Sequence, residues 1–243
     1  MRAAWTIAGR ELVSYFATPV AAVFIVIFLA LQGALTFNLG NFFARNQADL
    51  APFFTFLPWV LLLLVPALSM RLWAEERRAG TIEMLLTLPI TAFQAVLGKF
   101  LAAWAFCAIA IVLTFPFVLT VNYLGSPDNG VIACGYLGAI LIAGCYIALG
   151  GALSAVTRNQ VIAFVLAVAA CFVVTASGTP LVTDFLARGA PALAEIARRI
   201  SVADRYQGMT RGVIQLRDLI YFASFSGFFL FLTTVVIDHR RAN

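Results

Sequence analysis

Charged side chains are scarce in this sequence. Of its 243 residues only 11% are charged, while 63% are hydrophobic. A soluble domain carries about 25% charged residues. A chain of this composition would be insoluble in water unless lipid covered most of it, so the composition excludes an ordinary soluble domain and indicates a membrane protein.

The residues that most catalytic and nucleotide sites need are also missing. His239 is the only histidine, which excludes an H-E-x-x-H zinc site and a histidine-based triad. The pair Gly98 and Lys99 lacks the upstream glycine of a P-loop, because position 93 is phenylalanine. We therefore expect no catalytic residue, no bound cofactor and no metal in this chain.

The cysteines form no recognisable motif. All four lie in apolar runs and none forms a C-x-x-C pair: Cys107, Cys134, Cys145 and Cys171. They are either a redox or metal site or small packing residues. The second interpretation is favoured, since thiols in apolar surroundings behave as small hydrophobic groups.

Six charge-free runs are long enough to cross a bilayer, which needs roughly 20 apolar residues. They predict an all-α membrane protein, one domain over residues 1–243, with no charge in the middle of any span. Intramembrane acids are expected in proton-coupled carriers, so this absence argues against one. The predicted spans are residues 20–37, 52–70, 96–121, 131–156, 161–177 and 219–237.

Two regions outside the spans carry amphipathic patterns. Residues 1–19 place Trp5 and Phe16 opposite a polar row that includes Arg10, which predicts a helix in the membrane interface. We expect that the first apolar run is not a cleaved signal peptide, because it follows the acidic Glu11 and is longer than the apolar region of a signal peptide. Residues 178–218 are long and mixed in charge, and from the residues alone they are interpreted as a surface loop.

Basic residues at the span ends indicate the orientation. If both termini are cytoplasmic, the inner side holds nine basic residues and the two short outer loops hold only Arg45, which agrees with the positive-inside rule. The six arginines of residues 178–218 conflict with that rule. Since the basic residues are dispersed rather than clustered on one face, we expect no nucleic-acid partner. The nine basic residues assigned to the cytoplasmic side are Arg2, Arg10, Arg71, Arg77, Arg78, Lys99, Arg158, Arg240 and Arg241.

A charged island separates the second and third spans. Six charged residues lie between Arg71 and Glu83, and Lys99 closes the region as a seventh. Between Gly80 and Pro89 the apolar residues Ile82, Leu85 and Leu86 share one side, which predicts a two-turn helix at the membrane surface. It is either a lever that docks into a soluble partner or a solvated loop.

Residues 74–89 (AEERRAGTIEMLLTLP) resemble the E-x-x-x-G-T-x-E-x-L-L-x-x-P signature of ABC-2 type permeases, the membrane subunits of ATP-driven exporters. The entry to the first span at Tyr15 to Pro19 and the stretch Gly98 to Phe100 are also similar to that family. Residues 204–221 resemble the gliding-motility-associated GldF branch, except that Arg205 and Tyr206 stand where that branch has histidine and phenylalanine.

The resemblance implies a fold, partners and site residues. The fold is six spans, an N-terminal elbow helix at residues 1–19, a cytoplasmic coupling helix within residues 71–95 and external re-entrant helices within residues 178–218. The partners are two ABC ATPase subunits carrying ATP and Mg, a second copy or a related permease, the lipid bilayer, and a periplasmic or membrane accessory protein. The coupling residues would be Glu76, Gly80, Thr81, Glu83, Leu85, Leu86 and Pro89, and the external gate residues Arg205, Tyr206, Arg211, Gly212 and Asp218.

The expected function is therefore a permease subunit, not an enzyme, of an exporter in the bacterial inner membrane with both termini cytoplasmic. One alternative is a membrane anchor that recruits a soluble or periplasmic complex without transport. A membrane enzyme is disfavoured because the spans lack catalytic groups.

A ladder of small residues in the fourth span, from Gly135 to Ala155, serves either a dimer interface or internal packing.

Overall fold

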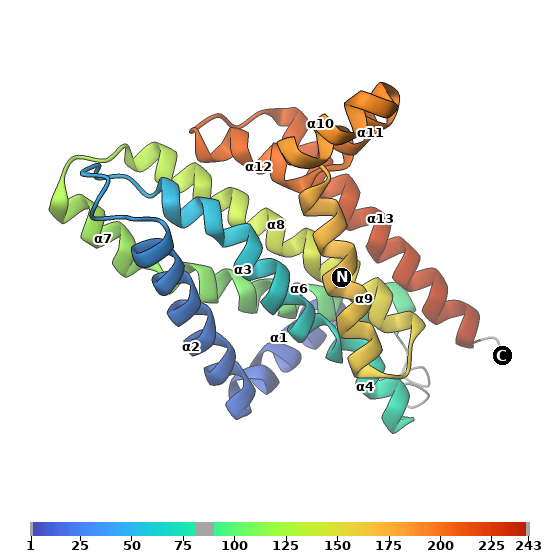
Figure 1. The fold of residues 1–243 in the computed structure, drawn as a ribbon. Helices are drawn as coiled ribbons and strands as arrows, with labels where there is room; N and C mark the ends of the chain where they lie inside the picture. Colours follow the sequence, from blue (N-terminus) through green and yellow to red (C-terminus); the bar gives the residue numbers. More distant parts are fainter. Residues whose placement is uncertain (1, 81–89, 242–243) are drawn as a thin grey trace.

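The computed structural model describes residues 2–80 and 90–241, and the described residues are helices joined by short connections (Figure 1). The helices are α1 (Arg2–Ala17), α2 (Pro19–Ala34), the π-helical turn η1 (Leu35–Leu39), α3 (Ala51–Ser69), α4 (Arg71–Ala79), α6 (Ala92–Val112), α7 (Phe115–Leu124), α8 (Asn129–Val156), α9 (Gln160–Ala176), α10 (Pro180–Gly189), α11 (Pro191–Ile200), α12 (Val202–Thr210) and α13 (Leu216–Arg241).

Five stretches of the described chain are long and apolar enough to span a membrane: Ala21–Leu39, Ala51–Ala79, Ala92–Leu124, Asn129–Val156 and Leu216–His239. A sixth arises only if α9 and α10 count as one span bent by 73°. The expected fifth span is therefore a short helix followed by a bend. The bend has a local cause, because Pro180 cannot continue the hydrogen-bond ladder of α9, and Gly178 lies so close to Ser201 that a Cβ atom there would be 2.2 Å from its Oγ.

The third predicted span is not one straight helix. α6 ends at Val112 and α7 begins at Phe115, because Pro116 in the first turn of α7 has no N–H to continue the ladder. The Thr114 hydroxyl lies in the break, where it donates to the carbonyl of Ile111 at 2.6 Å and lies 2.8 Å from the Tyr136 hydroxyl.

Helix α8 forms the centre of the molecule. It packs against α3, α6, α9, α12 and α13, and small residues allow these close approaches. At Gly135, a Cβ atom would be only 2.6 Å from the ring of Phe54, and Ala139 and Ala143 are completely buried. The ladder of small residues therefore serves packing inside this chain.

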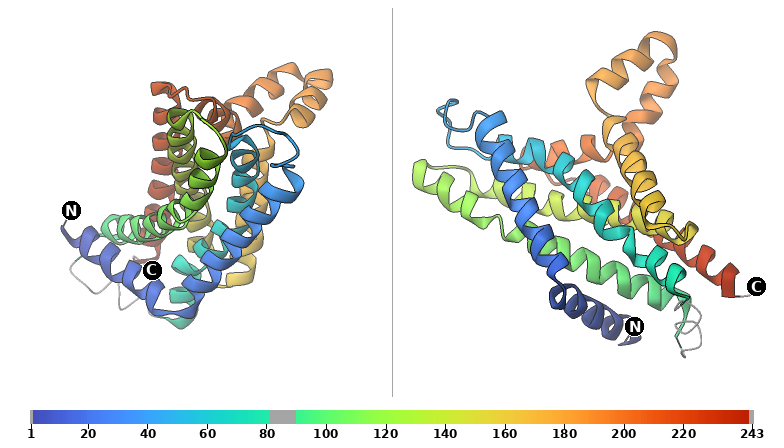
Figure 2. Two further views of the ribbon diagram at one scale, coloured as in Figure 1. Left: turned by 90° about the vertical axis from the view of Figure 1, so that its left-hand side faces the viewer. Right: turned by 60° about the horizontal axis from the view of Figure 1, so that its bottom comes forward.

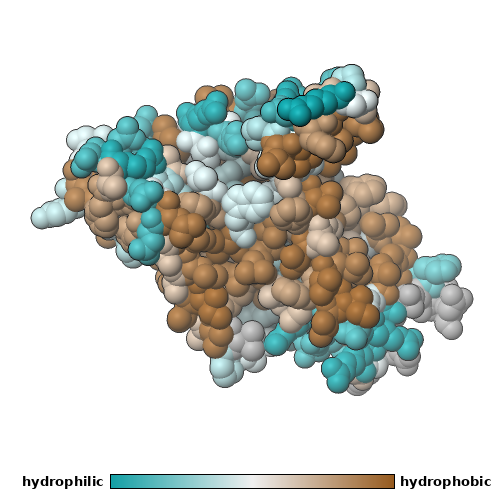
Figure 3. All heavy atoms as spheres, in the orientation of Figure 1, coloured by the Kyte–Doolittle hydropathy of each residue, from teal (hydrophilic) through white to brown (hydrophobic). Residues whose placement is uncertain are grey.

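Hydrophilic residues gather at two ends of a hydrophobic band (Figure 3). α4, α1 and the connection between α8 and α9 lie at one end, whereas the connection after η1, the connection between α7 and α8, and α10 to α12 lie at the other (Figures 1 and 2). The connections thus alternate between the ends, as a multi-pass membrane protein requires. The α10–α11 pair projects away from the bundle, and Figure 2 shows α1 turning away from α2.

Candidate functional site

Helix α4 carries the described half of the charged island. Leu72, Trp73 and Ala74 on its inner side are buried, while Arg71 and Arg78 are exposed. The helix ends at Gly80, whose φ of 71° is the left-handed conformation that glycine adopts without a Cβ penalty. The chain therefore turns sharply at the point where the expected coupling segment begins.

The buried hydroxyl of Ser154 joins the start of α4 to the end of α8. Its oxygen accepts hydrogen bonds from the backbone N–H groups of Trp73 at 3.2 Å and Ala74 at 3.0 Å. It donates to the carbonyl of Met70 at 2.8 Å. The first N–H groups of a helix have no partner within that helix, so Ser154 supplies from α8 the cap that Met70 cannot provide.

Arg77 makes a second connection to the same end of α8. Its guanidinium donates to the backbone carbonyl of Ala155 at 2.6 Å. The last carbonyls of a helix carry partial negative charge, and a cation close to them is stabilising. α4 and the C-terminal end of α8 therefore complete each other's unpaired backbone groups.

Lys99 connects α4 to α1 and α6. Its ammonium lies 2.8 Å from a carboxylate oxygen of Glu76 on α4 and 3.4 Å from one of Glu11 on α1. The Lys99 side chain is only 5% exposed, so the pairs are shielded from salt and water. The ring of Trp73 lies 5.4 Å from the same ammonium, within the range of a cation–π contact.

Glycine at position 98 explains how α1 comes so close to α6. A Cβ atom there would lie 2.8 Å from Cβ of Ile7 and 2.9 Å from the carbonyl oxygen of Ala4. Both Ala4 and Ala8 are buried in this contact. The adjacent Gly98 and Lys99 therefore act together, one allowing the close approach and the other pairing with Glu11.

We call Glu11, Trp73, Glu76, Arg77, Lys99 and Ser154 the α4 junction. Of the coupling residues expected from the sequence, the structure describes Glu76 and Gly80. Glu76 points inward to Lys99 with its side chain 21% exposed, rather than outward. Thr81, Glu83, Leu85, Leu86 and Pro89 lie outside the described residues.

At the opposite end, the expected gate residues fall into three places. Arg205 pairs with Asp218 at 3.4 Å, both largely buried, and its guanidinium lies 5.5 Å from the ring of Tyr221. Tyr206 is buried against Gly138 of α8. Arg211 is exposed, and Gly212 turns the chain with a φ of 81°.

Two hydrogen-bonding atoms of this external group have no partner in the part of the chain that the structure describes: Nε of Arg205 and the hydroxyl of Tyr206. Nearby, burial raises the pKa of the Asp204 carboxyl, an effect that Arg198 and Arg205 partly offset. The backbone N–H of Asp204 donates to the Ser201 hydroxyl at 3.3 Å, so Ser201 caps α12.

The described residues form no metal centre at either end. Within residues 2–80 and 90–241, no three histidine, cysteine, aspartate or glutamate side chains are grouped closely enough to hold a metal ion. Cys107, Cys145 and Cys171 are buried in the apolar core, as packing residues are. The α4 junction instead connects the surface helix α4 to three other helices, α1, α6 and α8.

These features define a multi-pass, all-helical membrane protein whose surface helix is fixed to its spans. A family model described as ABC-2 family transporter protein matches residues 36–237, so the chain belongs to the ABC-2 transporter family. That family is a membrane component of transporters and is not itself catalytic. No curated protein matches the chain.

Proposed function

We propose that this chain is the permease subunit of an ATP-driven exporter that works with two separate ATPase subunits binding ATP and Mg. A second copy or a related permease completes the membrane part. The supporting observation is the α4 junction. It holds rigid the helix that leads directly into residues 81–89, where the E-x-x-x-G-T-x-E-x-L-L-x-x-P signature continues.

In this proposal the ATPases act on residues 81–89 and α4 carries the displacement inward. A displacement of α4 reaches α8 through Ser154 and Arg77. It reaches α6 and α1 through Lys99. Since buried, well-packed elements shift as units rather than deform continuously, closing of the ATPases would rearrange the spans together.

The proposed location is the bacterial inner membrane with both termini cytoplasmic. The end that carries α1, α4 and Arg158 would face the cytoplasm, because it holds most of the basic residues outside 178–218. Arg205, Tyr206, Arg211, Gly212 and Asp218 would then lie at an external gate. The likeness of residues 204–221 to the GldF branch favours a periplasmic or membrane accessory protein as a further partner.

The alternative is an anchor that recruits a complex without transport. Copurification from native membranes separates the two functions. A permease brings down a protein with a P-loop and ATPase activity, whereas an anchor brings down none.

The coupling residues are tested by Glu83→Arg. A positive charge in the docking segment is expected to abolish copurification of the ATPase or to leave hydrolysis that no longer responds to the permease. Glu195→Arg is the matched control, because it makes the same charge change on exposed α11. Unchanged copurification and coupling in Glu83→Arg would contradict the assignment.

A further inference from the structure

A pocket of about 480 Å³ lies between α1, α2, α3 and α4, beside the α4 junction. One part of its wall is charged and includes Glu11, Arg71 and Glu75. Another part is apolar and includes Ile27 and Leu68. A pocket with a charged part and an apolar part fits an amphiphile better than a purely polar or purely apolar ligand.

Three of the five charged side chains that line this pocket pair with one another. Lys99 is satisfied by Glu11 and Glu76, and Arg10, which is mostly exposed, also approaches Glu11 at 3.6 Å. Arg71 and Glu75 remain, one positive and one negative. Neither makes an ion pair with another residue of the described chain.

Arg71 and Glu75 are four residues apart on α4, which places their Cβ atoms about 5–6 Å from each other. Such residues commonly pair with each other, yet here both are exposed at the pocket. A ligand that carries a negative and a positive group a few ångströms apart would satisfy both. Guanidinium binds phosphate through paired N–H donors, and a carboxylate accepts hydrogen bonds from a primary ammonium.

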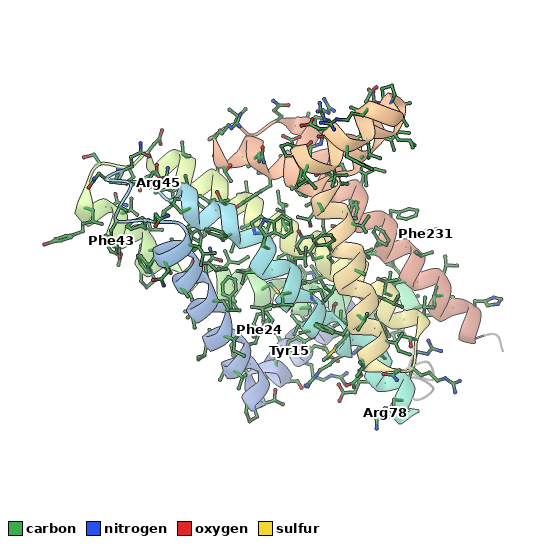
Figure 4. All side chains as sticks on the ribbon, in the orientation of Figure 1. Tyr15, Phe24, Phe43, Arg45, Arg78 and Phe231 are labelled. Atoms are coloured by element: carbon green, nitrogen blue, oxygen red, sulfur yellow. The ribbon has the colours of Figure 1, made fainter. Side chains whose placement is uncertain are left out.

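The apolar wall continues towards the membrane. Val23 and Ile27 on α2 line the pocket and are also exposed, and Figure 3 shows hydrophobic surface where α2 lies. Tyr15 and Phe24 close the inner side by packing on Phe106, with ring centroids 5.6 and 5.2 Å apart. Figure 4 shows Tyr15 and Phe24 near the turn from α1 into α2.

We propose that this pocket binds one phospholipid whose headgroup carries a phosphate and a primary ammonium, as in phosphatidylethanolamine. The phosphate lies on Arg71 and the ammonium on Glu75. One acyl chain follows the wall of Val23 and Ile27 out to the bilayer. This binding does not depend on the proposed function, because the chain alone supplies every contact.

The test is native mass spectrometry of the full chain in detergent, titrated with phosphatidylethanolamine, phosphatidylcholine and phosphatidylglycerol of identical acyl chains. We expect the first to bind with a dissociation constant at least tenfold lower than the other two. Soluble glycerophosphoethanolamine at the same concentration should not displace it, since it lacks the acyl chains. Equal binding of the three lipids, or displacement by the soluble headgroup, would overturn the proposal.

Variants locate the lipid in this pocket. Arg71→Gln and Glu75→Gln are each expected to raise the dissociation constant about tenfold, the equivalent of one lost charge-assisted hydrogen bond. Arg78→Gln is the control, because Arg78 is exposed on the same helix and does not line the pocket. Ala67→Phe narrows the pocket without changing charge and should weaken binding equally. The proposal fails if the first two variants bind like the unmodified chain, or no more weakly than Arg78→Gln, with all melting temperatures unchanged.

Discussion

At the scale of single residues, Ser154 shows how one hydroxyl can replace a local helix cap. α4 follows α3 after a single residue, Met70, whose side chain forms no capping hydrogen bond. The N–H groups of Trp73 and Ala74 would be unpaired in a place that water does not reach. Since an unpaired buried donor is costly, the hydroxyl on α8 fixes where α4 begins.

Replacing that hydroxyl should cost stability. Ser154→Ala leaves two buried N–H donors and the Met70 carbonyl without this partner, and an unsatisfied buried group costs about 1–3 kcal/mol. We expect a lower melting temperature in detergent. Ser224→Ala is the matched control, because the Ser224 hydroxyl is exposed and bonds only within α13. Equal melting temperatures for the two variants would show that Ser154 does not fix α4.

At the scale of elements, the packing of α1 on α6 depends on a missing side chain. Gly98 lets the backbone of α1 come close enough for Glu11 to reach Lys99. A larger residue would separate the helices and lengthen that ion pair. The interfacial elbow expected at residues 1–19 is therefore tied to α6.

Gly98→Leu tests this contact. The new side chain meets Ile7 and the carbonyl of Ala4, and overpacking of this kind costs about 1–3 kcal/mol. We expect a lower melting temperature and loss of the Lys99–Glu11 pair. Gly9→Ala serves as the comparison, since a Cβ atom at Gly9 meets nothing within 4 Å, and alanine should stabilise a helix by about 0.5–1 kcal/mol. A Gly98→Leu protein as stable as Gly9→Ala would contradict the close packing.

Local patterns predicted the elements better than their connections. Thr91 and Gln94 form a capping box at the start of α6, and such a pattern can be read from the sequence because both members lie within four residues of each other. The contacts of the α4 junction were not predictable, since Ser154 is more than 80 residues from Trp73 and Lys99 is 88 residues from Glu11. Ser154 in particular is the one serine of an apolar helix, and nothing in the neighbouring sequence indicates its role.

At the scale of the whole molecule, the number of spans depends on how α9 and α10 are counted. Charge-free length predicted the fifth of six spans over residues 161–177, but length carries no information about a bend. The bend contains Pro180, which cannot continue the hydrogen-bond ladder of α9, and Gly178, whose close approach to Ser201 leaves no room for a Cβ atom. The rest of residues 178–218 lies with α10 to α12 at the end opposite α4 (Figure 1).

Cysteine labelling tests this arrangement in the membrane. In a chain whose four cysteines are replaced by alanine, Arg199→Cys should react with an impermeant maleimide in intact spheroplasts. Arg78→Cys should react only after the membrane is opened, because the two residues lie at opposite ends (Figures 1 and 4). Arg45→Cys should behave like Arg199→Cys. Labelling of Arg78→Cys and Arg199→Cys from the same side would overturn the topology.

Helix α8 connects the two ends of the molecule. Its 28 residues extend about 42 Å at 1.5 Å each. Ser154 holds one end of α8 to α4. Gly138 lies nearer the other end, where it packs against the ring of Tyr206 on α12. Because a helix of this length is stiff, a displacement of one end of α8 would also displace the other end. In the proposed permease, a displacement of α4 would move α8 through the Ser154 contacts and would reach α12 through Tyr206, so both ends of the molecule would move together.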